Sequence, residues 1–207
     1  DKVLSHELFQ GGDKEAYNMS TDIFVVDTPF LIAKLEEEAA KEEPRKLRYV
    51  LRDLAVAENA FAYEYTGYLS NIHSVKAYFD ANLDMLESHK FYKLFAPNQK
   101  VYTKVKNEEP TYYSDSSEVK LSQFASGSIV RGKVENSVIS RNVDLSEGSS
   151  VSHSILFPRV KVAKGATVEY AIVDKGVEIA EGVTIRGTEN NPVVIKKGSV
   201  VTEDIVR

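Results

Sequence analysis

The last third of this chain carries a short repeat of aliphatic residues. Most of them follow one another at steps of six or five residues: Val134, Ile139, Leu145, Val151, Leu156, Val162, Val168, Val173, Ile179, Ile185, Ile195 and Val201. Val134, Val151, Val168 and Ile185 are also spaced 17 residues apart. A fixed short period of this kind indicates stacked structural units, so the sequence predicts a solenoid in this region.

Two further positions recur within each unit. A small or branched residue follows most of the aliphatic residues by four positions, and we expect it to point into the same narrow interior: Val138, Val143, Ser149, Ile155, Val160, Ala166, Ile172, Val177, Val183, Ser199 and Ile205. Glycine follows five of them by three positions: Gly148, Gly165, Gly176, Gly182 and Gly198. These glycines are expected at corners, where a positive φ angle costs least for a residue without Cβ.

The units resemble those of the hexapeptide-repeat family. Many residues are β-branched, which favours short extended segments, and the three-and-four spacing of a helix is absent. The resemblance implies a left-handed parallel β-helix of triangular section, with coils of six, five and six residues. The segment 187–192 (GTENNP) interrupts the step from Ile185 to Ile195 and is interpreted as a loop.

Composition excludes several classes of protein. The 207 residues include 26 Lys and Arg against 31 Asp and Glu, for a net charge of −5. Without a basic stripe we expect no nucleic-acid partner. The apolar runs are too short to cross a bilayer, so no membrane role is expected, and without a visible secretory leader a cytoplasmic location is the default. There is no cysteine, and the first residue, Asp1, is not Met, which suggests a fragment.

Residues 1–112 are interpreted as a partial α/β domain that precedes the β-helix domain, residues 113–207. Ile23–Asp27 and Ala60–Tyr68 are predicted strands. A first helix is expected from Thr28 to the residues before Pro44, and a second has Leu47, Val50, Leu51 and Leu54 on one face. A third helix is capped by Ser74. The phosphate-binding glycine loop of a nucleotide-binding domain is missing, since Gly11-Gly12 is an isolated pair.

Several strings resemble the carboxyl half of ADP-glucose pyrophosphorylase (glucose-1-phosphate adenylyltransferase). The segment 20–30 (STDIFVVDTPF) is similar to the family's SMGIYVFD, and 68–86 (YLSNIHSVKAYFDANLDML) to its YWRDVGTLEAYWKANLDL. The segments 155–162 (ILFPRVKV) and 171–183 (AIVDKGVEIAEGV) resemble its β-helix signatures. The resemblance covers nearly the whole chain.

One departure from the family motif bears on activity. Catalytic members carry an aspartate in the DVGT motif that helps to hold the metal, and Asn71 occupies that position here. A neutral amide cannot replace the charge of a carboxylate on Mg²⁺, the ion expected for the family reaction. Asp22 also replaces a family glycine. This pattern resembles the GlgD-type subunit, the divergent companion of the catalytic subunit, and it predicts no cofactor in this chain.

The resemblance also nominates binding residues, each with a plainer alternative. Ser20 matches a serine that contacts glucose, or is an ordinary strand serine. Asn71 and His73 form either a remodelled ligand site or a vestigial loop. Arg159 and Lys175 lie where the family carries basic residues for sugar-phosphate or nucleotide effectors, or are solvated corner residues.

These observations lead to a hypothesis about function. We expect a non-catalytic or regulatory subunit that assembles with the catalytic subunit, with itself through the β-helix, or with both. One alternative is a hexapeptide acyltransferase that uses His153 as its base. The other is a pure assembly scaffold.

Overall fold

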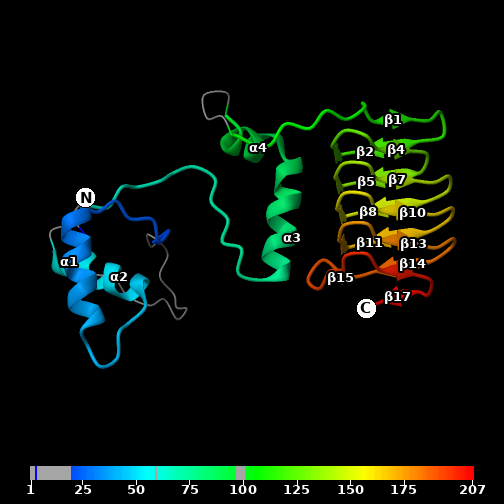
Figure 1. Ribbon diagram of the computed structural model, residues 1–207. Coiled ribbons are helices and arrows are strands. Elements are labelled where there is room, and N and C mark those ends of the chain that lie inside the picture. Colours follow the sequence, from blue (N-terminus) through cyan, green and yellow to red (C-terminus); the bar gives the residue numbers. More distant parts are fainter. Residues whose placement is uncertain (1–2, 4–19, 59, 97–100) are drawn as a thin grey trace. The chain divides into compact units, whose positions relative to one another are not determined.

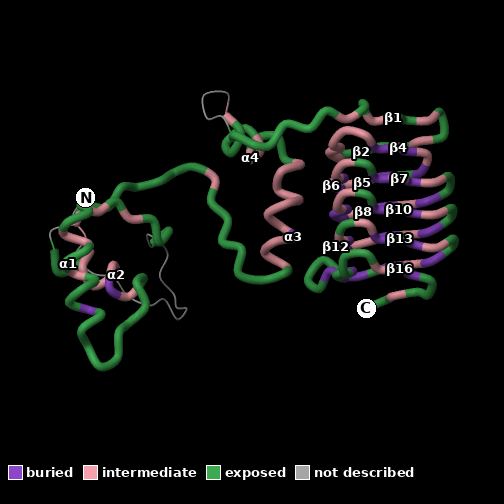
Figure 2. Tube along the Cα trace, in the orientation of Figure 1, coloured by how far each residue is buried: buried purple, intermediate pink, exposed green. Residues whose placement is uncertain are grey.

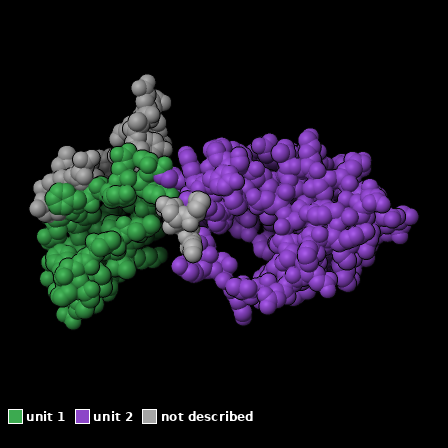
Figure 3. Space-filling model, turned by 90° about the horizontal axis from the view of Figure 1, so that it is seen from above, with its two compact units in different colours: residues 1–66 green, residues 67–207 purple. Residues whose placement is uncertain are grey.

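The computed structural model describes residue 3 and residues 20–58, 60–96 and 101–207. The chain forms two compact units, residues 1–66 and 67–207 (Figure 3). Among the described residues, no helix is both long and apolar enough to cross a membrane. The boundary expected near residue 112 is the point where the strands begin. The compact units divide earlier, after residue 66, because a helix that contains Phe79 packs against the strands and belongs to the same unit.

The first unit contains two of the predicted helices, α1 (Thr28–Ala39) and α2 (Leu47–Ala57). The Asp27 carboxylate caps α1 by accepting a hydrogen bond from the Phe30 amide at 3.0 Å, and Pro29 occupies the first turn. The second helix buries Val50, one of the four residues predicted on its apolar face. Helix α1 ends at Ala39, several residues before Pro44.

A buried carboxylate organises the turn that follows α1. Glu38 is 5% exposed and accepts hydrogen bonds from Arg45 through its backbone amide at 3.0 Å and its Nε at 2.9 Å. Lys41 also donates to this carboxylate. The hydrogen bonds from Arg45 and Lys41 hold the pKa of Glu38 well below its usual range. Because buried charges require partners, this cluster favours a tight turn over a longer helix.

The two strands predicted in the first unit are wrong. Residues 23–27 are extended without belonging to a strand, and in the segment 60–66 only Phe61 forms a single β-bridge. Ile23 and Val25 are almost fully exposed. A strand becomes stable only when a neighbouring strand satisfies its backbone and a packed layer covers one face. The segment 60–66 forms the bridge at Phe61 and accepts a hydrogen bond from the Val3 amide at the Ala60 carbonyl, 3.0 Å away, but these contacts do not extend into a strand.

The second unit is a parallel β-solenoid preceded by three helical segments (Figure 1). The helical segments are α3 (Val75–Leu83), a 3₁₀ turn (Asp84–Leu86) and α4 (Ser88–Leu94). The first sheet contains β1 (Tyr112–Tyr113), β4 (Ile129–Val130), β7 (Asp144–Leu145), β10 (Lys161–Val162), β13 (Glu178–Ile179) and β16 (Val200–Val201). The second contains β2 (Glu118–Lys120), β5 (Lys133–Glu135), β8 (Ser150–Ser152), β11 (Thr167–Glu169), β14 (Thr184–Arg186) and β17 (Ile205–Val206). The third contains β3 (Gln123–Phe124), β6 (Val138–Ile139), β9 (Ile155–Leu156), β12 (Ala171–Val173) and β15 (Val193–Ile195).

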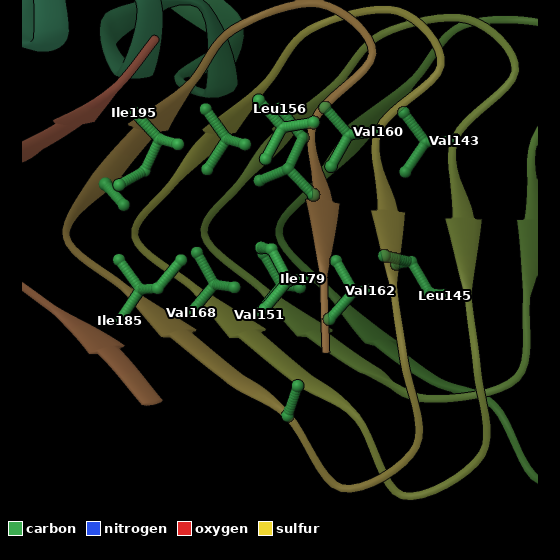
Figure 4. Packing of buried hydrophobic residues seen from close by; sticks show 14 of the residues in the cluster. Val143, Leu145, Val151, Leu156, Val160, Val162, Val168, Ile179, Ile185 and Ile195 are labelled. Atoms are coloured by element: carbon green, nitrogen blue, oxygen red, sulfur yellow. The ribbon is translucent and has the colours of Figure 1, made fainter. Parts of the chain in front are cut away.

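The 17-residue period is the register of the second sheet. Val134, Val151, Val168 and Ile185 are consecutive parallel partners in that sheet. All twelve aliphatic residues of the repeat lie in one buried cluster, which confirms the predicted core. Their side chains meet in the interior of the coils (Figure 4), and buried positions recur along the stacked strands (Figure 2).

The corners are also as predicted. Gly148, Gly165, Gly176, Gly182 and Gly198 all have φ between 66° and 71°. Four residues with side chains share the left-handed conformation at the corner between the second and third sheets: Leu121, Asn136, His153 and Tyr170. The loop at residues 187–192 is present and is closed by an antiparallel bridge between Thr188 and Asn191.

The third sheet departs from the predicted inward pattern. Val138, Ile155 and Ile172 were expected to point into the core, but each directly precedes a core residue on its strand. Neighbouring strand residues face opposite sides of a sheet, so these three face outward. Ile155 and Ile172 pack with Phe79 of α3, which is 1% exposed. Helix α3 therefore joins the solenoid through an apolar outer face. Other residues of the set, including Val143, Val160 and Val177, are in the core as expected.

Small residues occupy the interior of the third sheet and form a ladder of hydrogen bonds. The Ser137 amide donates to Ser122 Oγ, the Ser154 amide to Ser137 Oγ, and the Ala171 amide to Ser154 Oγ, each at 3.1 Å. Ser137 and Ser154 are fully buried. Each hydroxyl thus satisfies a backbone amide of the next coil.

Replacing Ser154 with alanine should leave the Ala171 amide buried without an acceptor. Because an unsatisfied buried donor is costly, we expect the free energy of unfolding of the solenoid to fall by about 1–3 kcal/mol in urea titrations. Ser150→Ala, on the outer side of β8, is the control and should change it by about 0.5 kcal/mol or less. Equal effects of the two substitutions would contradict the role of the ladder.

Replacing Phe79 with alanine should release α3 from the solenoid. Removal of a buried Phe costs about 3–5 kcal/mol, and here the loss falls on a single helix contact. We expect faster amide hydrogen exchange in α3 with little change in the strands, measured by mass spectrometry. Tyr92→Ala, at an exposed position of α4, should leave α3 protected. A uniform loss of protection along the solenoid would show that α3 is not a separately docked element.

Candidate functional site

The loop before α3 holds the residue that departs from the family motif. Asn71 and His73 are exposed. The backbone carbonyl oxygen of Asn71 accepts a hydrogen bond from the His73 backbone amide at 3.1 Å and lies 3.0 Å from His73 Nδ1. Ser74 caps α3, as predicted, with its Oγ accepting from the Ala77 amide at 3.0 Å. The loop is therefore a local turn that leads into the helix.

The carboxylates near this loop are already paired with cations. Asp80 lies 2.6 Å from Lys76 Nζ, and Asp84 lies 2.6 Å from Lys90 Nζ. Tyr68 also donates to Asp84 at 3.0 Å. Across the described residues, no group of three or more His, Cys, Asp or Glu side chains could hold a metal ion. Mg²⁺ is bound through one or two free carboxylates and substrate phosphates; here the motif position supplies a neutral amide, and Asp80 and Asp84 are held by lysines, so these residues do not fit a Mg²⁺ site.

Ser20 belongs to the first unit, where its side chain makes a local contact. Its Oγ accepts a hydrogen bond from the Asp22 amide at 3.2 Å. Asp22, the residue in place of the family glycine, keeps a positive φ of 55°. The backbone conformation that suits glycine is thus retained with a carboxylate attached. Gly11 and Gly12 lie outside the described residues.

Basic residues from successive coils lie along one corner of the solenoid, between the third and first sheets. We call the set Arg141, Arg159, Lys175, Lys196 and Lys197 the basic corner. Backbone hydrogen bonds stack its turns: the Arg159 amide donates to the Arg141 carbonyl at 3.0 Å, and the Gly198 amide to the Lys175 carbonyl at 2.9 Å. The Gly176 amide also donates to the Pro158 carbonyl at 3.0 Å, so the turns that carry Arg159 and Lys175, the two residues predicted as an effector site, lie on neighbouring coils.

The cations of the basic corner differ in their pairing. Arg141 is neutralised by Glu108, whose carboxylate lies 3.1 Å from its Nη1. Arg159 and Lys175 are exposed, and no ion pair joins either to another described residue. The Asp174 carboxylate accepts the Lys175 backbone amide at 2.7 Å and adds one negative charge nearby. Two surface cations that are not held in ion pairs can bind a phosphate group through charge-assisted hydrogen bonds.

His153 lies at the corner between the second and third sheets, in a column with Asn136 and Tyr170. Its ring stacks on that of Tyr170 at a centroid distance of 4.8 Å and an angle of 16°. Its Nε2 lies 3.2 Å from Asn136 Nδ2, and its Nδ1 is buried without a hydrogen-bond partner among the described residues. Both nitrogens are thus enclosed by the corner. This environment suits a packed residue better than the exposed base of an acyltransferase.

Sequence reasoning missed the outward apolar column that seats α3. The signal was available in the spacing, since Ile155 and Ile172 each come immediately before an inward residue. Adjacent strand positions cannot both face the core, so the pattern itself indicates a second apolar surface.

Comparisons with known proteins agree with the fold and with the sequence motifs. The family model described as GlmU-like, C-terminal hexapeptide, matches residues 106–206. The glycogen biosynthesis protein GlgD of Bacillus subtilis is 34% identical over 95% of this chain and 55% of its own length. GlgD of Geobacillus stearothermophilus is 53% identical over 61% of this chain and 37% of its own length.

A relative that carries the name of an enzyme is also similar to this chain. The glucose-1-phosphate adenylyltransferase of Mycoplasma mobile is 31% identical over 51% of this chain and 27% of its own length. The chain spans about half the length, or less, of these curated relatives. By these matches, and by the motifs at residues 20–30 and 68–86, the chain belongs to the family of GlgD proteins and glucose-1-phosphate adenylyltransferases.

Proposed function

We propose that this chain is part of a non-catalytic subunit of glucose-1-phosphate adenylyltransferase. The family reaction joins ATP and glucose 1-phosphate to give ADP-glucose and pyrophosphate for glycogen synthesis. Asn71 carries the proposal, because its side chain places a neutral amide where catalytic members use a carboxylate, while its backbone carbonyl oxygen makes the contacts of the local turn. The match to GlgD over nearly the whole chain supports the same role.

The role proposed for the chain is assembly with, and modulation of, a catalytic subunit. On this proposal the catalytic subunit binds the Mg²⁺ of the reaction, since the described residues here do not fit that ion. The solenoid supplies rigid contact surfaces. On the same proposal, residues 1–112 are the carboxyl-terminal part of a nucleotidyltransferase-like α/β domain. The solenoid is a left-handed β-helix, and the subunit is cytoplasmic.

The chain alone should release no pyrophosphate from ATP and glucose 1-phosphate in the presence of Mg²⁺. The reason is that the metal carboxylate is absent, and phosphoryl-type transfer depends on the metal for charge neutralisation. A coupled pyrophosphate assay measures this, with a catalytic glucose-1-phosphate adenylyltransferase as the positive control. Asn71→Asp should also remain silent, because one carboxylate does not complete a metal site. Robust turnover by the unmodified chain would overturn the non-catalytic role.

Arg159 and Lys175 are proposed to bind an anionic effector such as a sugar phosphate or a nucleotide. Calorimetric titration with glucose 1-phosphate and with inorganic phosphate should show saturable binding that weakens about tenfold or more in Arg159→Ala/Lys175→Ala. Lys164→Ala, at an exposed position on another corner, is the matched control and should bind as the unmodified chain does. Unchanged binding in the double variant, or none in the unmodified chain, would remove this site from the proposal.

A further inference from the structure

The corner that carries the basic residues begins with an acidic segment of the same chain. At each turn of this corner a backbone amide donates to a carbonyl of the turn before it. The first of these bonds runs from the Gly127 amide to the Glu109 carbonyl at 2.6 Å, and the second from the Asn142 amide to the Ser126 carbonyl at 3.2 Å. The segment 108–109 therefore lies at the first turn of the corner, and the basic corner continues the same stack.

The carboxylate of Glu108 is surrounded by three donor side chains. Its Oε1 lies 3.1 Å from Arg141 Nη1 and 3.4 Å from Asn142 Nδ2, and its Oε2 accepts from Ser126 Oγ at 3.1 Å. The side chains of Glu108 and Arg141 are 21% and 32% exposed. A guanidinium, an amide and a hydroxyl that converge on one carboxylate are the donors of an oxyanion site. We call Ser126, Arg141 and Asn142 the carboxylate cradle.

The carboxylate cradle adjoins the two cations that are not held in ion pairs. Arg141 and Arg159 lie on consecutive coils, which are about 4.8 Å apart in a parallel stack. The donors that bind a carboxylate also bind a phosphate group. A phosphate group carries about −1.5 to −2 charges near pH 7, against one for a carboxylate, so it is the stronger ligand for several cations at once. A phosphate group at Arg159 and Lys175 thus lies within the same stack of turns as the guanidinium that Glu108 now holds.

We propose that the carboxylate cradle completes the anion site of the basic corner, and that Glu108 is an internal competitor for it. A phosphate group held by Arg159 and Lys175 displaces the Glu108 carboxylate and gains Arg141 as a third cation. The net affinity is lower than the three cations would give alone, because the pair between Glu108 and Arg141 must first be broken. This inference rests on the effector site of the proposed function and adds the residue that regulates it.

The surroundings of Glu108 favour a contact that a ligand can displace. The turn is held without this carboxylate, by the backbone bond to Glu109 and by the Thr111 hydroxyl, which donates to the Ala125 carbonyl at 2.7 Å. Ion pairs that are partly exposed contribute little to stability. The preceding residues, 101–107, belong to no helix or strand. The Glu108 side chain can therefore leave the cradle while the corner stays folded.

Calorimetric titration of the 207-residue chain with inorganic phosphate and with glucose 1-phosphate tests the competition. Glu108→Gln keeps the shape of the side chain and an oxygen for Ser126, but removes the charge that holds Arg141. It should bind phosphate about fivefold or more tightly than the unmodified chain. Glu147→Gln makes the same change of charge at an exposed position on another corner, and should bind as the unmodified chain does. Thermal unfolding should be the same for all of these chains.

A double-mutant cycle with Arg141 is the decisive measurement. If Glu108 acts by holding that guanidinium, its removal helps only where the guanidinium is present. Glu108→Gln should therefore improve phosphate binding about fivefold or more beside Arg141, but about twofold or less in the Arg141→Ala background. A gain with both ligands assigns the cradle to the phosphate group itself, whereas a gain confined to glucose 1-phosphate assigns it to a sugar phosphate.

The outcomes separate this inference from the proposed effector site. If Arg159→Ala/Lys175→Ala loses phosphate but Glu108→Gln changes nothing, the effector site stands and the internal competitor is excluded. An equal gain from Glu108→Gln with and without Arg141 would also overturn the inference, because the carboxylate would then act only through its general charge. Binding by Glu108→Gln and none by the unmodified chain would support the cradle and remove effector binding from the proposed function. No binding by either chain would overturn both.

Discussion

The burial of one branched side chain from each short strand is the interaction on which the second unit depends. A strand of two or three residues has almost no stability alone, since it buries one side chain and makes few hydrogen bonds. Stacking at a constant register of 17 residues gives every such side chain a neighbour above and below, and burial of each stabilises by about 1.5–3 kcal/mol. The corners follow from the same requirement, because the chain must turn sharply after every strand to keep the next side chain in the interior.

The constant register explains why the solenoid was predictable and where the prediction stopped. Residues such as Val134 and Val151 recur at a fixed step, which is typical of a solenoid, so the core could be predicted from the spacing. The outer faces are less constrained, because any residue that tolerates water can occupy them. Ile155 and Ile172 were assigned to the wrong side because apolar character was weighed above strand alternation. What covers an apolar outer face depends on a distant segment, here α3, which the repeat does not specify.

In the first unit, helices could be predicted from the local sequence, whereas strands could not. The ends of α1 and α2 depend on local groups, such as the Asp27 cap and the Glu38 cluster, and the helices were predicted largely correctly. The segments around Val25 and Phe61 have the residue types of strands, but neither forms a strand, and Phe61 makes a single β-bridge. Strand formation is a property of two segments together, so residue type in one segment cannot establish it. The same limit applies to Ser20, which lies beside the segment around Val25. Its role in binding glucose stays a prediction.

The outer surface of the solenoid is where its coils differ from one another. Every coil must bury apolar side chains in the same narrow interior, so the interior residues repeat from coil to coil. They therefore carry little information about function. The outer positions are free to differ from coil to coil, and their differences are where a role can be encoded. Paired charges cover the middle coils, an apolar column seats α3, cations without an ion pair mark one corner, and Val200 and Val206 follow charged residues on the last coil. Departures from the repeat, like Asn71 in the family motif, are therefore the positions from which function can be argued.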